Sequence, residues 1–451
     1  MSNQKTSEEM NRRNFLRSTA AAGAGLAFSP MVLGQAGGKK TDDINVGLLG
    51  CGAQGQELMN ACLKIPGIRF KAVCDIWTAY NQRRVSRLLQ RYRHENNTYV
   101  DYKEMLDKEK GLDAVIIATP DFWHAEHAVA CLKAGLDVYC EKEMSNTLEG
   151  AGRMLKAAKE TGKLLQIGHQ RRSNPRYIHC YKNLINGSKL LGRITTINGQ
   201  WNRGKAACED LGFPKTAEID QPTLEKYGFK SMSQFRNWRW YKGLGGGPIV
   251  DLGSHQIDIY SWFLGTNPES VMASGGIDYW KGHDWYDNVM AVYEYETTKG
   301  VVRAFYQTIT TNSSNGYFET FMGDEGTLVI SEAAGRGEVY REAWVPAENW
   351  EKWVKMGFLK TPAIPEEEKP ASDAILDVRE SPKPPSYDIP VTMDKLYHQP
   401  HLENFFDAMR GKAKLNCPAQ IGYETAVTVL KVNEAVAVGK KLNFKPEDFK
   451  A

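Results

Sequence analysis

Two short stretches of the chain carry side chains that could move a proton. Lys142 stands between two glutamates directly after an apolar run, and Asp251 and His255 are four residues apart in a second stretch. If that stretch is helical, its acid and its imidazole are neighbours on one face. An acid beside a histidine can fix the tautomer of the ring and stabilise its protonated form, so His255 is a candidate general base. A lysine can stabilise the oxygen that loses the proton.

Both stretches also have a purely structural interpretation. Lys142 could be a surface lysine paired by charge with Glu141 and Glu143. His255 could be one buried histidine in a capped helix. Residue types and spacing alone leave the functional and the structural interpretations open.

A glycine pattern near residue 50 is typical of a dinucleotide-binding loop. Gly50, Gly52 and Gly55 follow the apolar run 44–49 with the spacing G-x-G-x-x-G. The first glycine permits a tight turn, the second lets the backbone approach a pyrophosphate, and the third lets helix and strand pack closely. Asp75 ends the next apolar run, where a carboxylate would bind ribose hydroxyls and repel a 2′-phosphate. We therefore predict NAD as the cofactor, with NADP less favoured and a vestigial loop as the alternative.

The first elements that must position these residues are expected within residues 43–168, where two kinds of segment alternate. Apolar strand-like runs alternate there with amphipathic stretches, which predicts a parallel sheet with helices on both faces. Such sheets bind ligands at the carboxyl ends of their strands, where the sequences ATPDFWH and EKE follow the fourth and fifth expected strands. The expected strands are 44–49, 70–74, 114–118, 137–140 and 164–167, and the expected helices are 54–64, 77–92, 125–134 and 148–161.

The rest of the chain has a different pattern. Several runs with much alternation predict an antiparallel sheet in an α+β domain over residues 169–445, whose broad face could cover a site at the strand ends of the first domain. Within it, residues 331–398 hold eight of the nineteen prolines, and we expect an insertion that wraps the surface. The expected strands are 193–201, 270–277, 288–295, 301–310 and 316–322, and helices are expected at 401–409 and 422–438.

The N-terminus has the layout of an export signal. Arg12 and Arg13 begin the sequence RRNFLR, a weakly apolar stretch follows over 18–33, and small residues before position 37 suit a cleavage site. We predict a twin-arginine signal peptide over residues 1–36, export to the periplasm or beyond through the twin-arginine translocase, and no membrane anchor after processing. The alternative is a disordered tail with a chance pair of arginines.

Composition narrows the range of partners. The formal net charge is +3 at pH 7, which argues against a nucleic-acid binder, and the arginine cluster over 83–93 fits the solvent side of a helix. The eight cysteines form no CxxC and show no regular spacing. This favours buried thiols over a disulfide framework or a metal site, and we expect no metal.

Taken together, the motifs resemble the glucose–fructose oxidoreductase / inositol dehydrogenase / MocA-like family of sugar oxidoreductases. The resemblance covers nearly all of residues 43–445 and rests on GLLGCGAQG, ATPDFWH, YCEKE, GGGPIVDLGSHQID, GDEGTL and HLENF. It implies an α/β Rossmann domain with a doubly wound parallel sheet over residues 43–168. An α+β domain with an open, mostly antiparallel sheet would follow, in a chain that forms a homo-oligomer, either a dimer or a tetramer.

The resemblance also implies three groups of functional residues. The family's proline after the lysine is Glu143 here, which we expect to add a charge beside Lys142. Arg236 and Arg239 could bind hydroxyls or an acidic group. The implied catalytic residues are Lys142, Asp251 and His255. Those lining the cofactor would be Gly50, Gly52, Ala53, Gln54, Gly55, Asp75, Thr119, Pro120, His124, Glu141 and Lys142, and those contacting the sugar would be His169, Arg172, Asp251 and His255. Trp201 and Trp238 offer aromatic faces on which a sugar could stack, and packing in the core or at an interface is the alternative.

Export of such an enzyme constrains its redox chemistry. Free NAD is a cytoplasmic resource, so the cofactor should be tightly held and each oxidation should be reversed in place. We therefore predict an oxidoreductase that acts on sugar or glycoside hydroxyls, with C3 of a glucoside as one candidate position. One alternative is an NAD-dependent glycoside hydrolase that works by transient oxidation and elimination. A second alternative is a non-catalytic exported sugar-binding protein.

Overall fold

Residues 43–333, 335–361 and 384–450 are described by the computed structural model, and the predicted signal peptide over residues 1–36 lies outside them. The first sheet has six parallel strands in the order β3-β2-β1-β4-β5-β6, which confirms the predicted doubly wound arrangement. The strand order reverses between β1 and β4, where this fold binds its ligands. The strands are β1 Ile44–Leu49, β2 Ile68–Cys74, β3 Asn97–Tyr99, β4 Ala114–Ile117, β5 Asp137–Cys140 and β6 Leu165–Ile167.

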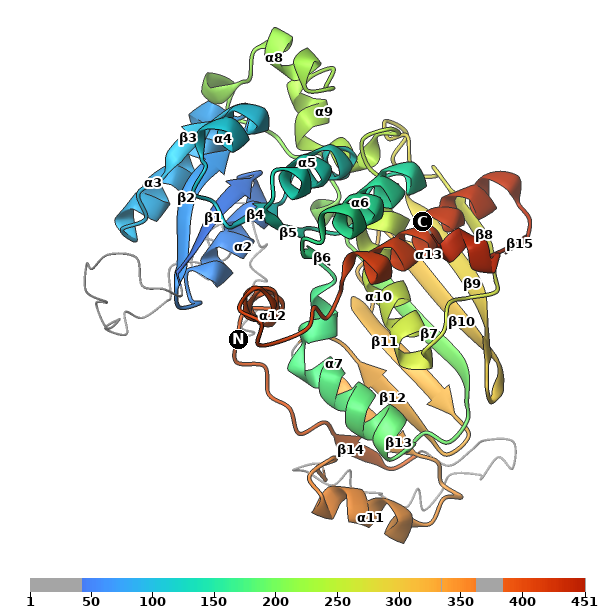
Figure 1. Ribbon diagram of the computed structural model, residues 1–451. Helices are drawn as coiled ribbons and strands as arrows, with labels where there is room; N and C mark the ends of the chain where they lie inside the picture. The colour runs from blue at the N-terminus through green and yellow to red at the C-terminus, as the bar shows by residue number, and fades with distance from the viewer. Residues whose placement is uncertain (1–42, 334, 362–383, 451) are drawn as a thin grey trace, which may run out of the picture. The chain divides into compact units, whose positions relative to one another are not determined.

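Helices cover both faces of this sheet (Figure 1). The apolar side chains of α2, α3 and the late helix α12 share one buried cluster with β1, whereas those of α4, α5 and α6 belong to a second cluster. Helix α6 begins where the side chain of Thr147 accepts a hydrogen bond from the N–H of Gly150 and ends at Gly162. The helices are α2 Ala53–Cys62, α3 Arg83–Arg91, α4 Tyr102–Lys108, α5 Asp121–Lys133, α6 Leu148–Thr161 and α12 Gln399–Met409.

A nine-stranded sheet follows, in the order β14-β13-β12-β11-β7-β10-β9-β8-β15. Among the described strand pairs, β7 and β10 are parallel and the others are antiparallel, which confirms the predicted mostly antiparallel sheet. The strands are β7 Ile194–Asn202, β8 Ser270–Gly276, β9 Asn288–Thr297, β10 Gly300–Ile309, β11 Tyr317–Gly323, β12 Gly326–Ile330, β13 Gly337–Arg341, β14 Ser386–Asp388 and β15 Leu442–Asn443.

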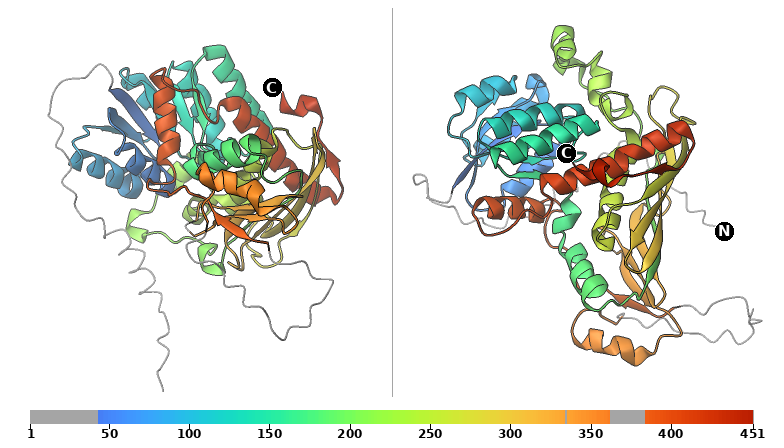
Figure 2. Two further views of the ribbon diagram at one scale, coloured as in Figure 1. Left: turned by 90° about the horizontal axis from the view of Figure 1, so that it is seen from below. Right: turned by 45° about the vertical axis from the view of Figure 1, so that its right-hand side comes forward.

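Two long helices, α10 (Gly247–Leu264) and α13 (Ala419–Val438), lie on one face of the second sheet (Figure 2). Helix α10 packs against β7, β9 and β10, and α13 packs against β8. Each helix ends at a glycine in the left-handed conformation, Gly265 with φ 71° and Gly439 with φ 63°. The functional stretch that contains Asp251 therefore sits on a rigid helix held against a sheet.

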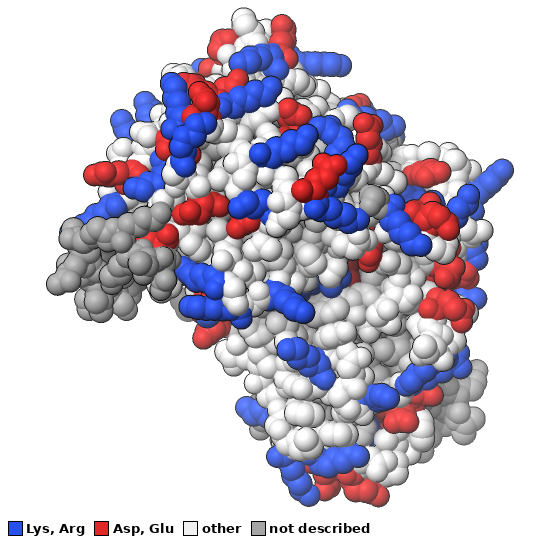
Figure 3. All heavy atoms as spheres, in the orientation of Figure 1, with Lys and Arg blue, Asp and Glu red and all other residues white. Residues whose placement is uncertain are grey.

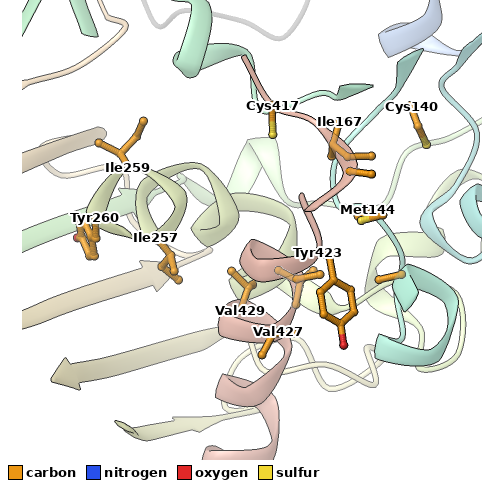
Figure 4. Close-up of a cluster of buried hydrophobic side chains, with 14 of the residues drawn as sticks. Cys140, Met144, Ile167, Ile257, Ile259, Tyr260, Cys417, Tyr423, Val427 and Val429 are labelled. Carbon is orange, nitrogen blue, oxygen red and sulfur yellow. The ribbon is translucent and has the colours of Figure 1, made fainter. Parts of the chain in front are cut away.

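The buried core is continuous from the second sheet to the first. Ile257 and Tyr260 of α10 belong to the same apolar cluster as Val427 of α13, and this cluster extends to Ile167 of β6 and to Cys140 of β5 (Figure 4). Both sheets belong to one compact unit of the chain. This shared core can therefore fix the positions of residues at the strand ends of the first sheet relative to residues of α10.

The segment between β7 and α10, residues 204–241, folds into short helices that we call the cap. It contains α8 (Gln221–Lys226) and α9 (Met232–Arg236), which Figure 1 shows beside the first sheet. The two helices begin at polar N-caps, the side chains of Asp220 and Ser231. The cap's apolar side chains form a separate cluster with Trp77, the residue that precedes the helical turn after β2.

The proline-rich segment over 331–398 contributes to the second sheet. Its described parts include β13 and β14, which pair with each other, and the helix α11 (Ala347–Lys355). No described helix is long and apolar enough to span a membrane. On the face drawn in Figure 3, basic and acidic side chains are intermixed, which agrees with the small net charge of +3.

Candidate active site at the strand ends

The glycine loop runs from the end of β1 into α2. Gly50 has φ 92°, a left-handed conformation that favours glycine. A side chain at Gly55 would collide with the carbonyl oxygen of Gly50, whereas the space beside Gly52 is open. The N-terminus of α2 therefore presents its backbone N–H groups to an open space, which is the arrangement that binds a pyrophosphate.

Asp75 follows β2 and faces the glycine loop. Its carboxylate accepts hydrogen bonds of 2.7 Å from the N–H groups of Cys51 and Trp77. Burial raises the pKa of Asp75, and these two hydrogen bonds oppose the rise. Asp75 lines the same cleft as Gly50 and Gly52. Its carboxylate keeps acceptor capacity for a ribose hydroxyl.

Of the three residues predicted in the loop after β4, Thr119 and Pro120 line the cleft, and His124 does not. His124 is buried, and its ring nitrogens lie 2.8 Å from the carbonyl oxygen of Thr119 and 2.7 Å from that of Glu143. Burial lowers the pKa of His124 to about 4. A neutral ring has a single N–H, so it donates to one of these two carbonyl oxygens.

Lys142 and Asp251 meet in the cleft. The Nζ atom of Lys142 donates to the carbonyl oxygen of Asp251 and lies 3.1 Å from its Oδ1. Arg239 donates from Nε to the same carboxylate oxygen at 3.2 Å. Burial would raise the pKa of Asp251, but the charges of Lys142, Arg239 and Arg203 hold it well below its usual range. Asp251 is therefore a charged partner that fixes the ammonium group of Lys142.

His255 lies one turn beyond Asp251 on α10, and it lines the same cleft. Burial and the charge of Lys142 hold the pKa of His255 well below its usual value, so the ring is neutral. Its Nδ1 atom is buried and has no hydrogen-bond partner among the described residues. The hydrogen bonds of Asp251 involve Lys142 and Arg239. We therefore revise the expected role of this acid, which holds the lysine and not the histidine.

Glu143 occupies the position of the family's proline, and the peptide bond between Lys142 and Glu143 is cis. Its side chain is 1% exposed. One carboxyl oxygen accepts a hydrogen bond of 2.7 Å from the N–H of Met144, and the other is buried without a partner in the described structure. Burial raises the pKa of Glu143 to about 8. Burial therefore disfavours the charge that we expected Glu143 to add beside Lys142.

Two of the residues predicted to contact sugar lie outside the cleft lining. Arg172 donates from Nε and Nη2 to the buried carboxylate of Asp258 at 2.8 to 2.9 Å. His169 is buried, and neither of its ring nitrogens has a hydrogen-bond partner within the described part of the chain. The residue between them that does line the cleft is Gln170. This segment therefore reaches the cleft through Gln170, which was not among the predicted site residues.

The predicted aromatic residues Trp201 and Trp238 both line the cleft. Trp201 stacks on Tyr317 of β11, with the ring centroids 4.5 Å apart and the planes inclined by 22°. The ring of His255 lies 5.3 Å from that of Trp201. Trp238 carries the guanidinium of Arg239 4.3 Å from its ring centroid. Aromatic surface thus lies beside both His255 and Arg239, which is one of the two ion-pair partners of Asp251.

His398 is a cleft residue that the sequence did not reveal. Its Nε2 lies 3.2 Å from the amide nitrogen of Gln54, and its Nδ1 is buried without a partner among the described residues. Gln54 also donates to Glu141 at 3.1 Å. Tyr397 lines the cleft beside it. The only signal was a tyrosine and a histidine just before the helix expected at 401–409, and the contact joins positions 344 residues apart.

All of these lining residues enclose one cleft of about 600 Å³, a size suited to a small-molecule ligand. One side is the carboxyl edge of the first sheet, and the remainder comes from the cap, α10, the second sheet, Gln170, and the residues Tyr397 and His398 that precede α12. In the described part of the chain no group of His, Cys, Asp or Glu is arranged to hold a metal ion. All eight cysteines are buried and free.

A Rossmann glycine loop that shares a cleft with a lysine, an acid and a neutral histidine is the arrangement of a nicotinamide-dependent oxidoreductase. The model of an oxidoreductase family with an NAD-binding Rossmann fold matches residues 44–169, and the model of the GFO/IDH/MocA C-terminal domain matches residues 185–329. The chain therefore belongs to the GFO/IDH/MocA oxidoreductase family. A twin-arginine translocation signal sequence matches residues 9–29, which indicates export by that pathway.

Curated relatives match only part of the chain. A glycosyl hydrolase family 109 protein of Shewanella baltica is 29% identical over 175 residues, which are 34% of this chain and 38% of that protein. The scyllo-inositol 2-dehydrogenase (NADP(+)) IolW of Bacillus subtilis is 29% identical over 241 residues, which are 53% of this chain and 56% of the relative. The chain thus spans about two fifths to somewhat over half the length of these relatives.

Solved structures share the fold over most of the chain. A levoglucosan dehydrogenase in complex with NADH and L-sorbose has a TM-score of 0.65 at 18% sequence identity, covering 91% of this chain and 100% of that one. The WlbA dehydrogenase of Bordetella pertussis, in complex with NADH and UDP-GlcNAcA, has a TM-score of 0.62 at 18% identity, covering 89% and 99%. At these identities the likeness establishes the fold alone.

Proposed function

We propose that this exported protein oxidises a hydroxyl group of a sugar or glycoside and keeps its NAD bound between turnovers. The observation that carries the proposal is the meeting of Lys142, Asp251 and His255 in the cleft that also contains the glycine loop. NAD, when bound, supplies the acceptor for the hydride of the oxidised carbon. The glycine loop, Asp75 and Thr119 would hold it, and they fit because the space beside Gly52 is open.

The chain's own residues would handle the proton. His255 would accept the proton of the substrate hydroxyl, because it lines the cleft and its Nδ1 has no partner among the described residues. Lys142 would stabilise the alkoxide that develops, and Asp251 holds the ammonium group of Lys142 in position at 3.1 Å. Trp201 offers an aromatic face next to His255, on which a sugar ring could stack.

The proposal favours NAD over NADP. Asp75 lines the cleft beside the glycine loop, and its carboxylate could bind the two hydroxyls of an adenosine ribose but would repel a 2′-phosphate. Export favours a resident cofactor, because a cofactor lost outside the cytoplasm is not replaced. A reduced cofactor must then return its hydride to a second sugar, to an external acceptor or to the oxidised product. Oxidation at C3 of a glucoside would fit this scheme.

Substitution of the two proton-handling residues tests the proposal. We expect Lys142→Ala and His255→Ala each to lower kcat by about 10²-fold to 10⁴-fold while bound NAD is retained. The measurement is formation of keto-sugar from a panel of glycosides, together with the nucleotide content of each variant. If both variants keep full turnover with NAD bound, this assignment of the residues is wrong.

A glycoside hydrolase is the second candidate function, and the match to a glycosyl hydrolase family 109 protein favours it. In that reaction, transient oxidation would permit elimination of the leaving group before the product is reduced again. Incubation with a nitrophenyl glycoside distinguishes the two functions without added cofactor. A keto-glycoside supports dehydrogenation, whereas free nitrophenol indicates cleavage. A purified protein that contains no nucleotide would favour the third possibility, a sugar-binding protein.

A further inference from the structure

The cap contacts residues that follow three strands of the first sheet, β2, β3 and β4. After β2, the indole N–H of Trp77 donates to a backbone carbonyl of the cap. After β3, the hydroxyl of Tyr227 donates to the carbonyl oxygen of Val100 at 3.2 Å. After β4, Phe122 packs edge-on against Phe229, with the ring centroids 5.5 Å apart. The cap thus bridges the edge at which open α/β sheets bind nucleotides.

Residues of the cap line the half of the cleft where the adenosine of a dinucleotide would lie. From the first sheet this half receives Asp75, Ile76 and Asn81, which follow β2. From the cap it receives Phe235 and Arg236. A site built from the sheet alone would have one wall here, and the cap supplies a second.

Arg236 is a half-buried cation at this wall. Its Nε donates to the carbonyl oxygen of Gly212 at 3.3 Å, and its guanidinium lies 5.2 Å from the ring centroid of Trp77. Within the described residues it forms no ion pair. Burial lowers the pKa of Arg236, which reflects the cost of removing a cation from water without a counter-charge. An anionic ligand in the cleft would supply that counter-charge.

We infer that the cap completes the adenosine half of the cofactor site and retains the dinucleotide, with Arg236 as the cap's counter-charge to the cofactor phosphates. This inference rests on the proposed function, in which NAD stays bound. The cofactor can then leave only when the cap detaches from Trp77, Val100 and Phe122. The cap is therefore the element that gives this enzyme a slowly released cofactor.

Release of NADH from the holoenzyme tests the inference. The protein is loaded with NADH, mixed with excess NAD, and the loss of bound NADH is followed by its fluorescence. We expect Arg236→Gln to raise the dissociation rate constant about tenfold or more, because a charge-assisted contact is lost. The control Arg153→Gln removes an exposed arginine on α6 and should leave the rate unchanged. Phe229→Ala loosens one anchor of the cap and should also speed release.

The possible failures can be distinguished. Unchanged release from both Arg236→Gln and Phe229→Ala would overturn the inference while leaving the proposed function intact. If Arg236→Gln speeds the release of NADPH but not that of NADH, the inference is also overturned. Arg236 would then bind a 2′-phosphate and would not retain NAD. A wild-type protein that neither carries nor takes up NADH would contradict the proposed function as well. Thermal unfolding of each variant shows that it is folded.

Discussion

Among the single residues, Asp251 has the greatest influence on the cleft. It forms ion pairs with Lys142 and Arg239 through one oxygen, at 3.1 and 3.2 Å, and it is mostly buried. A charged acid in such a place is stable only because these cations compensate its desolvation. The acid therefore fixes the position of Lys142, while His255 keeps an unpaired ring nitrogen for a ligand.

Glu143 gives a pH-dependent prediction at the same scale. Burial raises its pKa to about 8 from an ordinary value of 4.5, so the folded protein keeps a proton that the unfolded chain releases between these two values. The free energy of unfolding should therefore fall as pH rises through this window, by up to about 1.4 kcal/mol per pH unit. Glu143→Gln should remove this contribution, and urea unfolding at several pH values measures it.

The matched control for this prediction is Glu348→Gln, because Glu348 is exposed on α11. The free energy of unfolding of the Glu348→Gln variant should show the same pH dependence as that of the wild type. We expect the Glu143→Gln curve to be flatter than both and to show its largest relative gain at the alkaline end. Parallel curves for Glu143→Gln and the wild type would show that Glu143 titrates normally in the folded protein.

At this scale the sequence predicted residues whose role follows from local spacing. The glycine loop depends on short-range geometry that the chain itself encodes, whereas the contact of Asp251 with Lys142 joins positions 109 residues apart and replaces the expected pairing with His255. The partners of Arg172 and His398 could not be predicted in this way, because Asp258 and Gln54 come from distant parts of the chain. The raised pKa of Glu143 also depends on burial, which neighbouring residues in the sequence do not reveal.

Among the elements, the second sheet presents an open row of apolar side chains. Met272 of β8, Val292 of β9 and Phe305 of β10 are direct cross-strand partners and share one face. Met272 is 53% exposed, whereas its neighbour Val271 is fully buried. A partly exposed apolar row across three adjacent strands favours association with a second copy of the chain. This row is where we place the interface of the predicted homo-oligomer.

A charge in this row should disrupt that oligomer. We expect Val292→Arg to convert a dimer or tetramer into a smaller species, because a symmetric interface would bring the new arginines of two copies together without counter-charges. Light scattering coupled to size exclusion gives the mass. The control Val438→Arg changes a residue that is 47% exposed at the end of α13 and should leave the mass unchanged. A Val292→Arg protein with the wild-type mass would exclude this face as the interface.

The elements that the sequence predicted are those with a clear hydrophobic period. The parallel strands and α6 follow from apolar runs and end signals that are visible locally. Strand β3 was missed, because Asn97–Tyr99 is short and polar and is held by pairing with β2. The cap was not predicted either, since its apolar side chains pack on Trp77 and Phe122, more than 80 residues away in sequence. Contacts with residues outside the segment itself determine both strand β3 and the cap.

For the whole molecule, the export signal and the NAD-binding fold have to be explained together. The chain carries a twin-arginine signal and belongs to a family of NAD-binding oxidoreductases. The twin-arginine route transports folded proteins, so a cofactor bound in the cytoplasm could be carried along. A cap fastened over the adenosine half of the cleft would prevent its loss afterwards. Localisation and structure therefore support the same proposal, a closed redox cycle on sugars outside the cytoplasm.

The most direct test of this central claim is the nucleotide content of the exported protein. The mature protein is purified from the extracytoplasmic fraction without added cofactor and then denatured, and the released NAD and NADH are quantified. We expect nucleotide in an amount close to that of the chain, and its redox state should change when a substrate sugar is added before denaturation. Exported protein that releases no nucleotide, and that does not bind NADH when it is supplied, would contradict the claim.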